Sequence, residues 1–88
     1  MAKATVEFST RAADQLEGLE TEHAERIVSK LDDVTWNPEH YLRGRRMTNT
    51  PFYSLRVGDF RVIIDWRRDV DPEVLFVQRV GKRDSVYD

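Results

Sequence analysis

The residues best suited to chemistry are two arginines that face each other across a predicted β-hairpin. The runs on either side of Gly58-Asp59 are rich in β-branched and aromatic residues, and this dipeptide is typical of a two-residue turn. Such a turn places Arg56 directly opposite Arg61, and like charges in that position repel each other. We therefore expect an anion between them, a phosphate or a carboxylate. The alternative is a surface ion-pair network in which the arginines are bridged by Asp59, Asp65 or Asp84.

A strongly basic segment surrounds this pair. Residues 1–40 carry four basic and nine acidic side chains, and residues 69–88 carry three and five. Residues 41–68 carry two acidic side chains and seven arginines, which gives a charge of +5 (7 − 2) within a chain whose net charge is −2. Such a segment suits nucleic acid or an acidic protein partner, although a solvated arginine-rich surface is the alternative.

The composition excludes several classes of protein. The chain has no cysteine, which rules out disulfides and thiolate metal sites. His23 and His40 have no second ligand at metal-binding spacing, so we expect neither a metal nor a cofactor. The apolar runs are too short to span a bilayer and no apolar signal core is present, so we expect no membrane partner and a cytoplasmic location. With 88 residues, we expect one domain covering residues 1–88.

The hairpin needs other elements to cover it. Alternation puts one apolar set of side chains on the same face: Tyr53, Leu55, Val57, Phe60, Val62, Ile64 and Trp66. The other face carries Ser54, Arg56, Arg61, Ile63 and Asp65. Apolar residues at helical spacing predict helices over about 10–19 and 22–33, joined so closely that we expect a helical hairpin. Neither helix can bury its row of apolar side chains alone, so both are predicted to cover the apolar face of the sheet.

The remaining segments complete the predicted order. Residues 4–8 alternate and indicate a strand, and Trp36 and Trp66 are predicted to lie in the core. Residues 39–50 are expected to be a linker, and the almost continuous apolar run over 74–80 is typical of a central strand. The predicted fold is α+β, with two layers in the order β-α-α-β-β-β: an antiparallel sheet with a helical hairpin on one face.

Three motifs occur along these elements. The first is Leu42-Arg43-Gly44, the second is Tyr53-x-Leu-Arg-x-Gly-x-Phe-Arg-Val, and the third is Val80-Gly81-Lys82-Arg83 followed by Tyr87. In this order and at this spacing they resemble the RelE/ParE superfamily, the small toxins of bacterial and archaeal toxin–antitoxin pairs. The resemblance covers nearly the whole chain, and the Gly-Lys-Arg form favours the RelE branch. It implies a cognate antitoxin, and we expect that antitoxin to be acidic or amphipathic.

The resemblance implies an activity for each branch. The RelE branch is implied to cut messenger RNA in the ribosomal A site, and the ParE branch to block DNA gyrase without being a nuclease. In the RelE pattern the catalytic roles fall on Arg61, Arg83 and Tyr87. RNA supplies its own nucleophile, the 2′-hydroxyl, so the arginines would stabilise the phosphorane while Tyr87 acts as acid or base. Contacts to RNA are expected from Arg56, Lys82, Arg43, Arg45 and Arg46.

Two positions depart from the RelE pattern. The best-known RelE-type toxins carry lysines before the hairpin turn where this chain has Phe52 and Ser54, and neither side chain bears a charge at neutral pH. Three hypotheses follow: a metal-independent, ribosome-dependent endoribonuclease, a gyrase inhibitor of the ParE kind, and a degenerate member that binds its antitoxin without cutting. For Tyr87, packing against the sheet is the alternative to catalysis.

Overall fold

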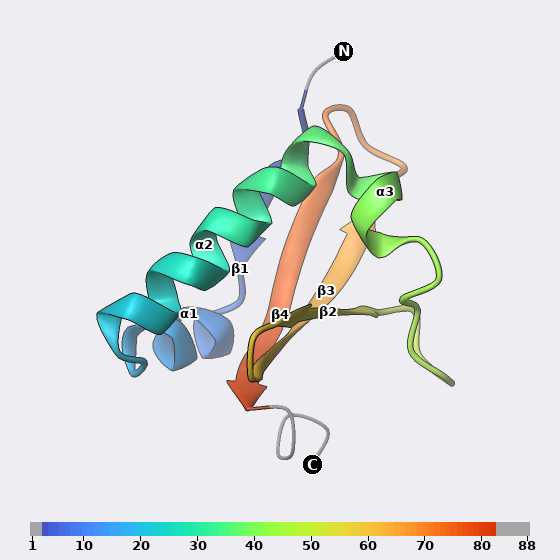
Figure 1. The fold of residues 1–88 in the computed structure, drawn as a ribbon. Helices are drawn as coiled ribbons and strands as arrows, with labels where there is room; N and C mark the ends of the chain where they lie inside the picture. The colour runs from blue at the N-terminus through green and yellow to red at the C-terminus, as the bar shows by residue number, and fades with distance from the viewer. Residues whose placement is uncertain (1–2, 83–88) are drawn as a thin grey trace.

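The computed structural model describes residues 3–82, and Arg83 and Tyr87 lie outside this range. The helices and strands follow in the order β1 (Thr5–Phe8), α1 (Thr10–Glu17), α2 (Thr21–Trp36), α3 (Pro38–Leu42), β2 (Tyr53–Val57), β3 (Phe60–Arg67) and β4 (Val74–Lys82) (Figure 1). No helix within residues 3–82 has the length and apolar character needed to cross a membrane.

The four strands form one sheet in the order β1-β4-β3-β2. The last three make the predicted antiparallel meander, and β4 is central as expected. The edge strand β1 corrects the expectation of a fully antiparallel sheet, because it pairs parallel with β4, from Thr5 beside Val74 to Phe8 beside Val77. Strands joined by a tight turn must be antiparallel, but three helices and two strands separate β1 from β4, so either direction is open to it.

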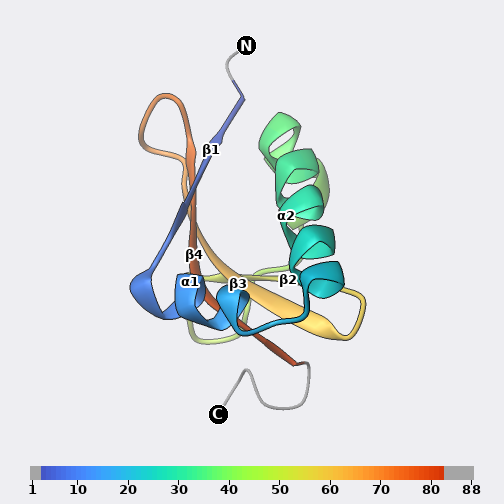
Figure 2. The same cartoon turned by 90° about the vertical axis from the view of Figure 1, so that its left-hand side faces the viewer.

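The helices and the apolar sheet face enclose one core, as predicted. Ala12 of α1 and Ile27, Leu31 and Val34 of α2 are buried against β2, β3 and β4, and Figure 2 shows α2 along one side of the sheet. Ser9 caps α1 by accepting a hydrogen bond from the backbone N–H of Ala12 at 3.0 Å.

The helix α1 also covers an edge of the sheet. Beyond Phe8, where β1 ends, the Ser9 hydroxyl donates to the Gln78 carbonyl at 2.8 Å. The Gln15 side-chain oxygen then accepts a hydrogen bond from the Val80 backbone N–H at 2.7 Å. A side chain thus takes the place that a neighbouring strand would occupy beside β4.

The prediction that Trp36 is a core residue is wrong. The helix α2 runs to Trp36, three residues beyond its expected end, because Pro38 disfavours helix only at Asn37. Trp36 comes nine residues after the buried Ile27, which is about two and a half helical turns, so its side chain lies on the opposite side of the helix. It is 67% exposed, whereas Trp66 is 8% exposed and lies in the core as expected.

The predicted linker over residues 39–50 begins as a helix. Pro38 occupies the first position of α3, where its missing N–H costs nothing, and the Asn37 side chain accepts from the His40 backbone N–H at 3.4 Å. Leu42 at its end is fully buried. This short helix therefore fixes the start of the arginine-rich segment that follows.

Candidate functional site

Arg56 and Arg61 are direct partners across the β2–β3 hairpin, as the two-residue turn predicts. Gly58 in the turn has a φ of +58°, which a residue with a side chain rarely adopts. Arg56 donates through Nε to the Gly58 carbonyl at 3.5 Å, and Arg61 donates through Nη1 to the Ser54 hydroxyl at 3.4 Å. Both arginines project from the sheet face opposite the helices.

No carboxylate within residues 3–82 neutralises this pair. The described ion pairs involve neither Arg56 nor Arg61. Asp65, one of the candidates for a bridge, instead pairs with Arg67 at 3.3 Å, and Asp84 lies outside the described residues. The alternative of a surface ion-pair network therefore has no support in the described part of the chain.

The segment after α3 runs alongside β2 and brings more arginines to Arg61. The backbone N–H of Ser54 donates to the Arg45 carbonyl at 2.9 Å, and Arg46 forms an isolated antiparallel bridge with Tyr53. Gly44, with a φ of +75°, turns the chain from α3 into this pairing. The pairing explains why Arg45 and Arg46 reach the same place as Arg61.

Between this segment and the hairpin lies a hollow of about 460 Å³, here called the arginine-lined hollow. Its lining residues are Gly44, Arg45, Arg46, Met47, Thr48, Ser54 and Arg61. The Nε atom of Arg61 is buried and has no hydrogen-bond partner among residues 3–82. A buried donor without an acceptor is costly. Arg61 also borders the hollow, where the outer N–H groups of a guanidinium can bind an anion.

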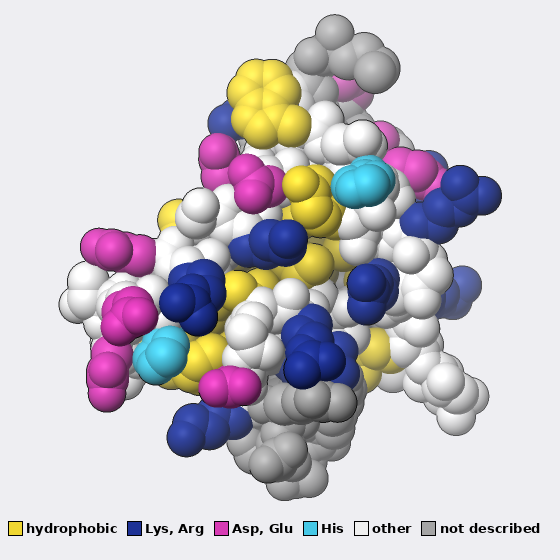
Figure 3. All heavy atoms as spheres, viewed as in Figure 1, with side chains coloured by type: hydrophobic (Ala, Val, Ile, Leu, Met, Phe, Trp, Pro, Cys, Tyr) yellow, Lys and Arg dark blue, Asp and Glu magenta, His cyan; other side chains and the backbone are white. Residues whose placement is uncertain are grey.

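The basic surface continues around β2 onto the helical side. A second hollow of about 700 Å³ is lined by Lys30, His40, Tyr41, Arg45, Leu55, Arg56 and Gly58, so Arg45 borders both hollows. Figure 3 shows Lys and Arg side chains gathering over the centre and lower right of this face, while Asp and Glu gather at its left edge. Positive charge is therefore concentrated around β2 and the segment that pairs with it.

A family of known proteins matches nearly the whole chain. The family model for the ParE toxin of the type II toxin–antitoxin system ParDE covers residues 6–87. The chain belongs to this toxin family. The RelE/ParE superfamily predicted from the three motifs is thereby confirmed.

Solved structures of RelE toxins share the fold of this toxin. The RelBE2 toxin–antitoxin complex of Mycobacterium tuberculosis matches with a TM-score of 0.77 and 23% identity over 94% of each chain. A mutant of the Escherichia coli toxin RelE in the free state matches with a TM-score of 0.75 and 26% identity over 97% of this chain and 88% of that one. The archaeal RelE–RelB complex of Pyrococcus horikoshii matches with a TM-score of 0.72 and 18% identity, over 98% of this chain and 100% of that one. No curated protein sequence matches significantly.

The toxin brings some of its predicted site residues together and leaves others apart. Arg61, Arg45 and Arg46 share the arginine-lined hollow, and Arg56 borders the second hollow. Arg43 and Lys82 are exposed and line neither one. The roles predicted for Arg83 and Tyr87 fall outside the described residues. Within residues 3–82, no three potential metal-ligating side chains cluster.

The sequence analysis did not place Arg79 on the sheet face that carries Arg61, where the structure puts it. Arg79 lies opposite Ile63, which itself lies opposite Ser54, so all three share the sheet face that carries Arg61. The pairing shifts between Ile63 and Ile64, because β4 holds an extra residue at Gln78. This bulge changes which side chains of β4 face the core, and an almost continuous apolar run gives no sign of it.

Proposed function

We propose that this toxin is a metal-independent endoribonuclease that cuts messenger RNA on the ribosome. The observation that supports this best is the arginine-lined hollow, which three arginines border and where Arg61 has no ion-pair partner among residues 3–82. Planar guanidinium groups pair with phosphate oxygens through two parallel hydrogen bonds, so the RNA backbone is the ligand that suits this hollow.

The three arginines and Ser54 of the hollow each have a role in the proposed reaction. Arg61, oriented by Ser54, binds the non-bridging oxygens of the scissile phosphate and stabilises the charge that develops in the phosphorane. Arg45 and Arg46 bind neighbouring phosphates and hold the backbone in line for attack by the 2′-hydroxyl. With Phe52 and Ser54 in place of lysines, Tyr87 is the proposed proton-transfer group, and Arg83 assists Arg61.

A cognate antitoxin is the proposed protein partner. The solved RelE toxins of M. tuberculosis and P. horikoshii are in complexes with their antitoxins. For this toxin we propose an acidic or amphipathic segment that lays carboxylates over the exposed arginines near β2. Such a segment would compete directly with RNA for the arginine-lined hollow. The proposed place of action is the cytoplasm, where ribosomes translate messages.

The family match favours a second candidate function, inhibition of DNA gyrase. The model that covers residues 6–87 is that of the ParE toxin. An inhibitor needs no proton-transfer group, and Phe52 and Ser54 supply none. This candidate predicts gyrase inhibition in vitro with no change in any RNA.

One experiment separates the candidates. The toxin is induced in cells, a translated message is mapped by primer extension, and purified toxin is added to a gyrase supercoiling reaction. The nuclease proposal expects new 5′ ends that disappear with Arg61→Ala and persist with the control Arg11→Ala, an exposed arginine on α1. Intact message with inhibited gyrase would overturn it in favour of the second candidate. Neither effect in a protein that binds its antitoxin would indicate a degenerate toxin.

A further inference from the structure

A second distinctive surface lies at the end of the molecule away from the β2–β3 turn (Figure 1). There the end of α2, the start of α3 and the loop between β3 and β4 enclose a hollow of about 550 Å³, here called the tryptophan-lined hollow. Both tryptophans of the chain line it, together with the charged residues Lys3, Glu39, Arg68, Asp71 and Glu73. None of these residues takes part in the arginine-lined hollow.

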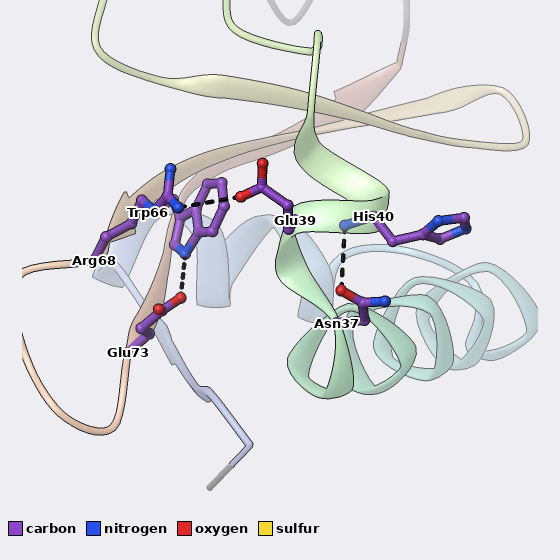
Figure 4. Close-up of polar contacts among 6 residues, drawn as sticks. All are labelled: Asn37, Glu39, His40, Trp66, Arg68 and Glu73. Carbon is purple, nitrogen blue, oxygen red and sulfur yellow. Dashed lines mark hydrogen bonds and ion pairs between the residues drawn. The ribbon is translucent and has the colours of Figure 1, made fainter. Parts of the chain in front are cut away.

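The floor of this hollow is the buried Trp66. Its indole Nε1 donates to the Glu73 carboxylate at 2.8 Å. The guanidinium of Arg68 lies 4.1 Å from the centre of the Trp66 ring and donates to Glu39 at 3.1 Å (Figure 4). The donor of Trp66 is therefore satisfied and its ring is covered, so the floor is a fixed surface.

The wall is Trp36, the last residue of α2. Two thirds of it is exposed, and the cation near it is Lys3, whose Nζ is 5.1 Å from the ring centre. Lys3 is itself paired with Asp32 at 3.4 Å. A large aromatic side chain left open beside a hollow is typical of a contact that dominates a protein interface.

The charge around the hollow is negative once its internal pairs are removed. Lys3 and Arg68 are each matched by one carboxylate. Asp71 forms no ion pair within residues 3–82, and Glu73 accepts from an uncharged indole. The C-terminal end of α2 also lies here, with no basic residue in its last turn, so the negative end of its helix dipole adds to the charge of the carboxylates.

We propose that the tryptophan-lined hollow binds an arginine side chain presented by a basic segment of a partner protein. A guanidinium group can stack on the open face of Trp36 while its N–H groups pair with Asp71 and Glu73. Nucleic acid is disfavoured by the same carboxylates. The partner is therefore opposite in charge to the ligand of the arginine-lined hollow, and the molecule can hold both at once.

Fluorescence tests this directly, because Trp36 and Trp66 are the only tryptophans and both line the hollow. The full chain is titrated with a short peptide of alternating glycine and arginine, with a matched peptide in which uncharged citrulline replaces arginine as the control. We expect a saturable change with the arginine peptide, weaker binding with lysine in its place, and none with citrulline.

Two variants and one matched control assign the binding to the hollow, with affinities measured by calorimetry. We expect Trp36→Ala and Asp71→Asn each to weaken binding by about tenfold or more. Glu25→Gln removes one negative charge at an exposed position of α2 outside the hollow and should leave binding unchanged. Equal affinities for Trp36→Ala and the unmodified chain, an equal loss with Glu25→Gln, or no saturable binding would each overturn the proposal.

Discussion

At the scale of single residues, Arg61 carries the proposed activity. Its Nη1 is held by Ser54 and its Nε is buried without a partner in the described part of the chain. We expect Arg61→Ala to slow message cleavage by about a hundred- to a thousandfold, the usual loss of one donor aimed at transition-state charge. Arg83→Ala is expected to act similarly. The thermal midpoint should hardly change, because no partner of Arg61 is left buried with an unmet charge.

The measurement is primer extension on a translated message, with circular dichroism to confirm folding and Arg11→Ala as the matched control. Message cleavage at the unmodified rate by folded Arg61→Ala protein would refute the role of this residue.

Tyr87 is predicted to transfer a proton rather than to stack on a base. Tyr87→Phe keeps the ring and removes only the hydroxyl, so it should slow cleavage far more than it weakens ribosome binding. Cleavage rates and ribosome co-sedimentation for the two proteins measure this. If Tyr87→Phe cleaves normally while Tyr87→Ala does not, the ring stacks. If both cleave normally, Tyr87 has no part in the reaction.

The sequence allowed some of these residues to be placed correctly. A two-residue turn fixes the pairing of a hairpin, so Arg56 opposite Arg61 followed from Gly58-Asp59 alone. Arg79 could not be placed, because the bulge at Gln78 leaves no mark in an apolar run. The environment of Trp36 depends on where α2 ends. Because the helix continues three residues beyond its expected end at residue 33, Trp36 is exposed and does not lie in the core.

At the scale of elements, the segment between α3 and β2 builds the arginine-lined hollow. It does so by pairing with β2 after the turn at Gly44. Gly44 has a φ of +75°, and a residue with a side chain in this conformation lowers the stability of the fold by roughly 1–2 kcal/mol, even though no heavy atom beyond the neighbouring residues lies within 4 Å of the added Cβ. We therefore expect Gly44→Ala to lower the free energy of unfolding by about that amount and to weaken RNA cleavage, because Arg45 and Arg46 move.

Gly44→Asn is the matched control, since asparagine tolerates this conformation better than alanine does. Chemical denaturation and primer extension on the three proteins make the comparison. Equal stability and equal cleavage for Gly44→Ala would mean that the turn does not position the arginines.

Elements with strong local signals were predictable, and those set by tertiary pairing were not. The stripe of α2 and the alternation of the hairpin each follow from one short window of sequence. The direction of β1 depends on how the chain returns after three helices and two strands, which no local pattern encodes. The pairing of residues 45–47 with residues 52–54 is likewise not encoded locally, because residues 45–47 carry no strand pattern of their own.

At the scale of the whole molecule, charge is divided between two ends. The arginines gather around β2, and unbalanced carboxylates gather at the tryptophan-lined hollow. For single-stranded RNA bound at the arginine end, the logarithm of the binding constant should fall linearly with the logarithm of salt concentration. We expect Arg45→Ala, which removes a side chain bordering both basic hollows, to reduce that slope by about 0.7, the value for one phosphate contact.

Fluorescence anisotropy of a labelled RNA oligonucleotide at several salt concentrations measures the slope. Arg68→Ala, at the opposite end of the molecule, should leave it unchanged. Identical slopes for Arg45→Ala and the unmodified toxin would place the RNA elsewhere.

The hydrogen bond from Val80 to Gln15 bears on how this protein behaves at high concentration. An uncovered stretch of β4 would offer its backbone to any passing extended chain, including the same stretch of a second molecule. By placing an amide oxygen on that backbone N–H, α1 removes the starting point for a continuous sheet across molecules. Gln15 therefore serves solubility as much as folding.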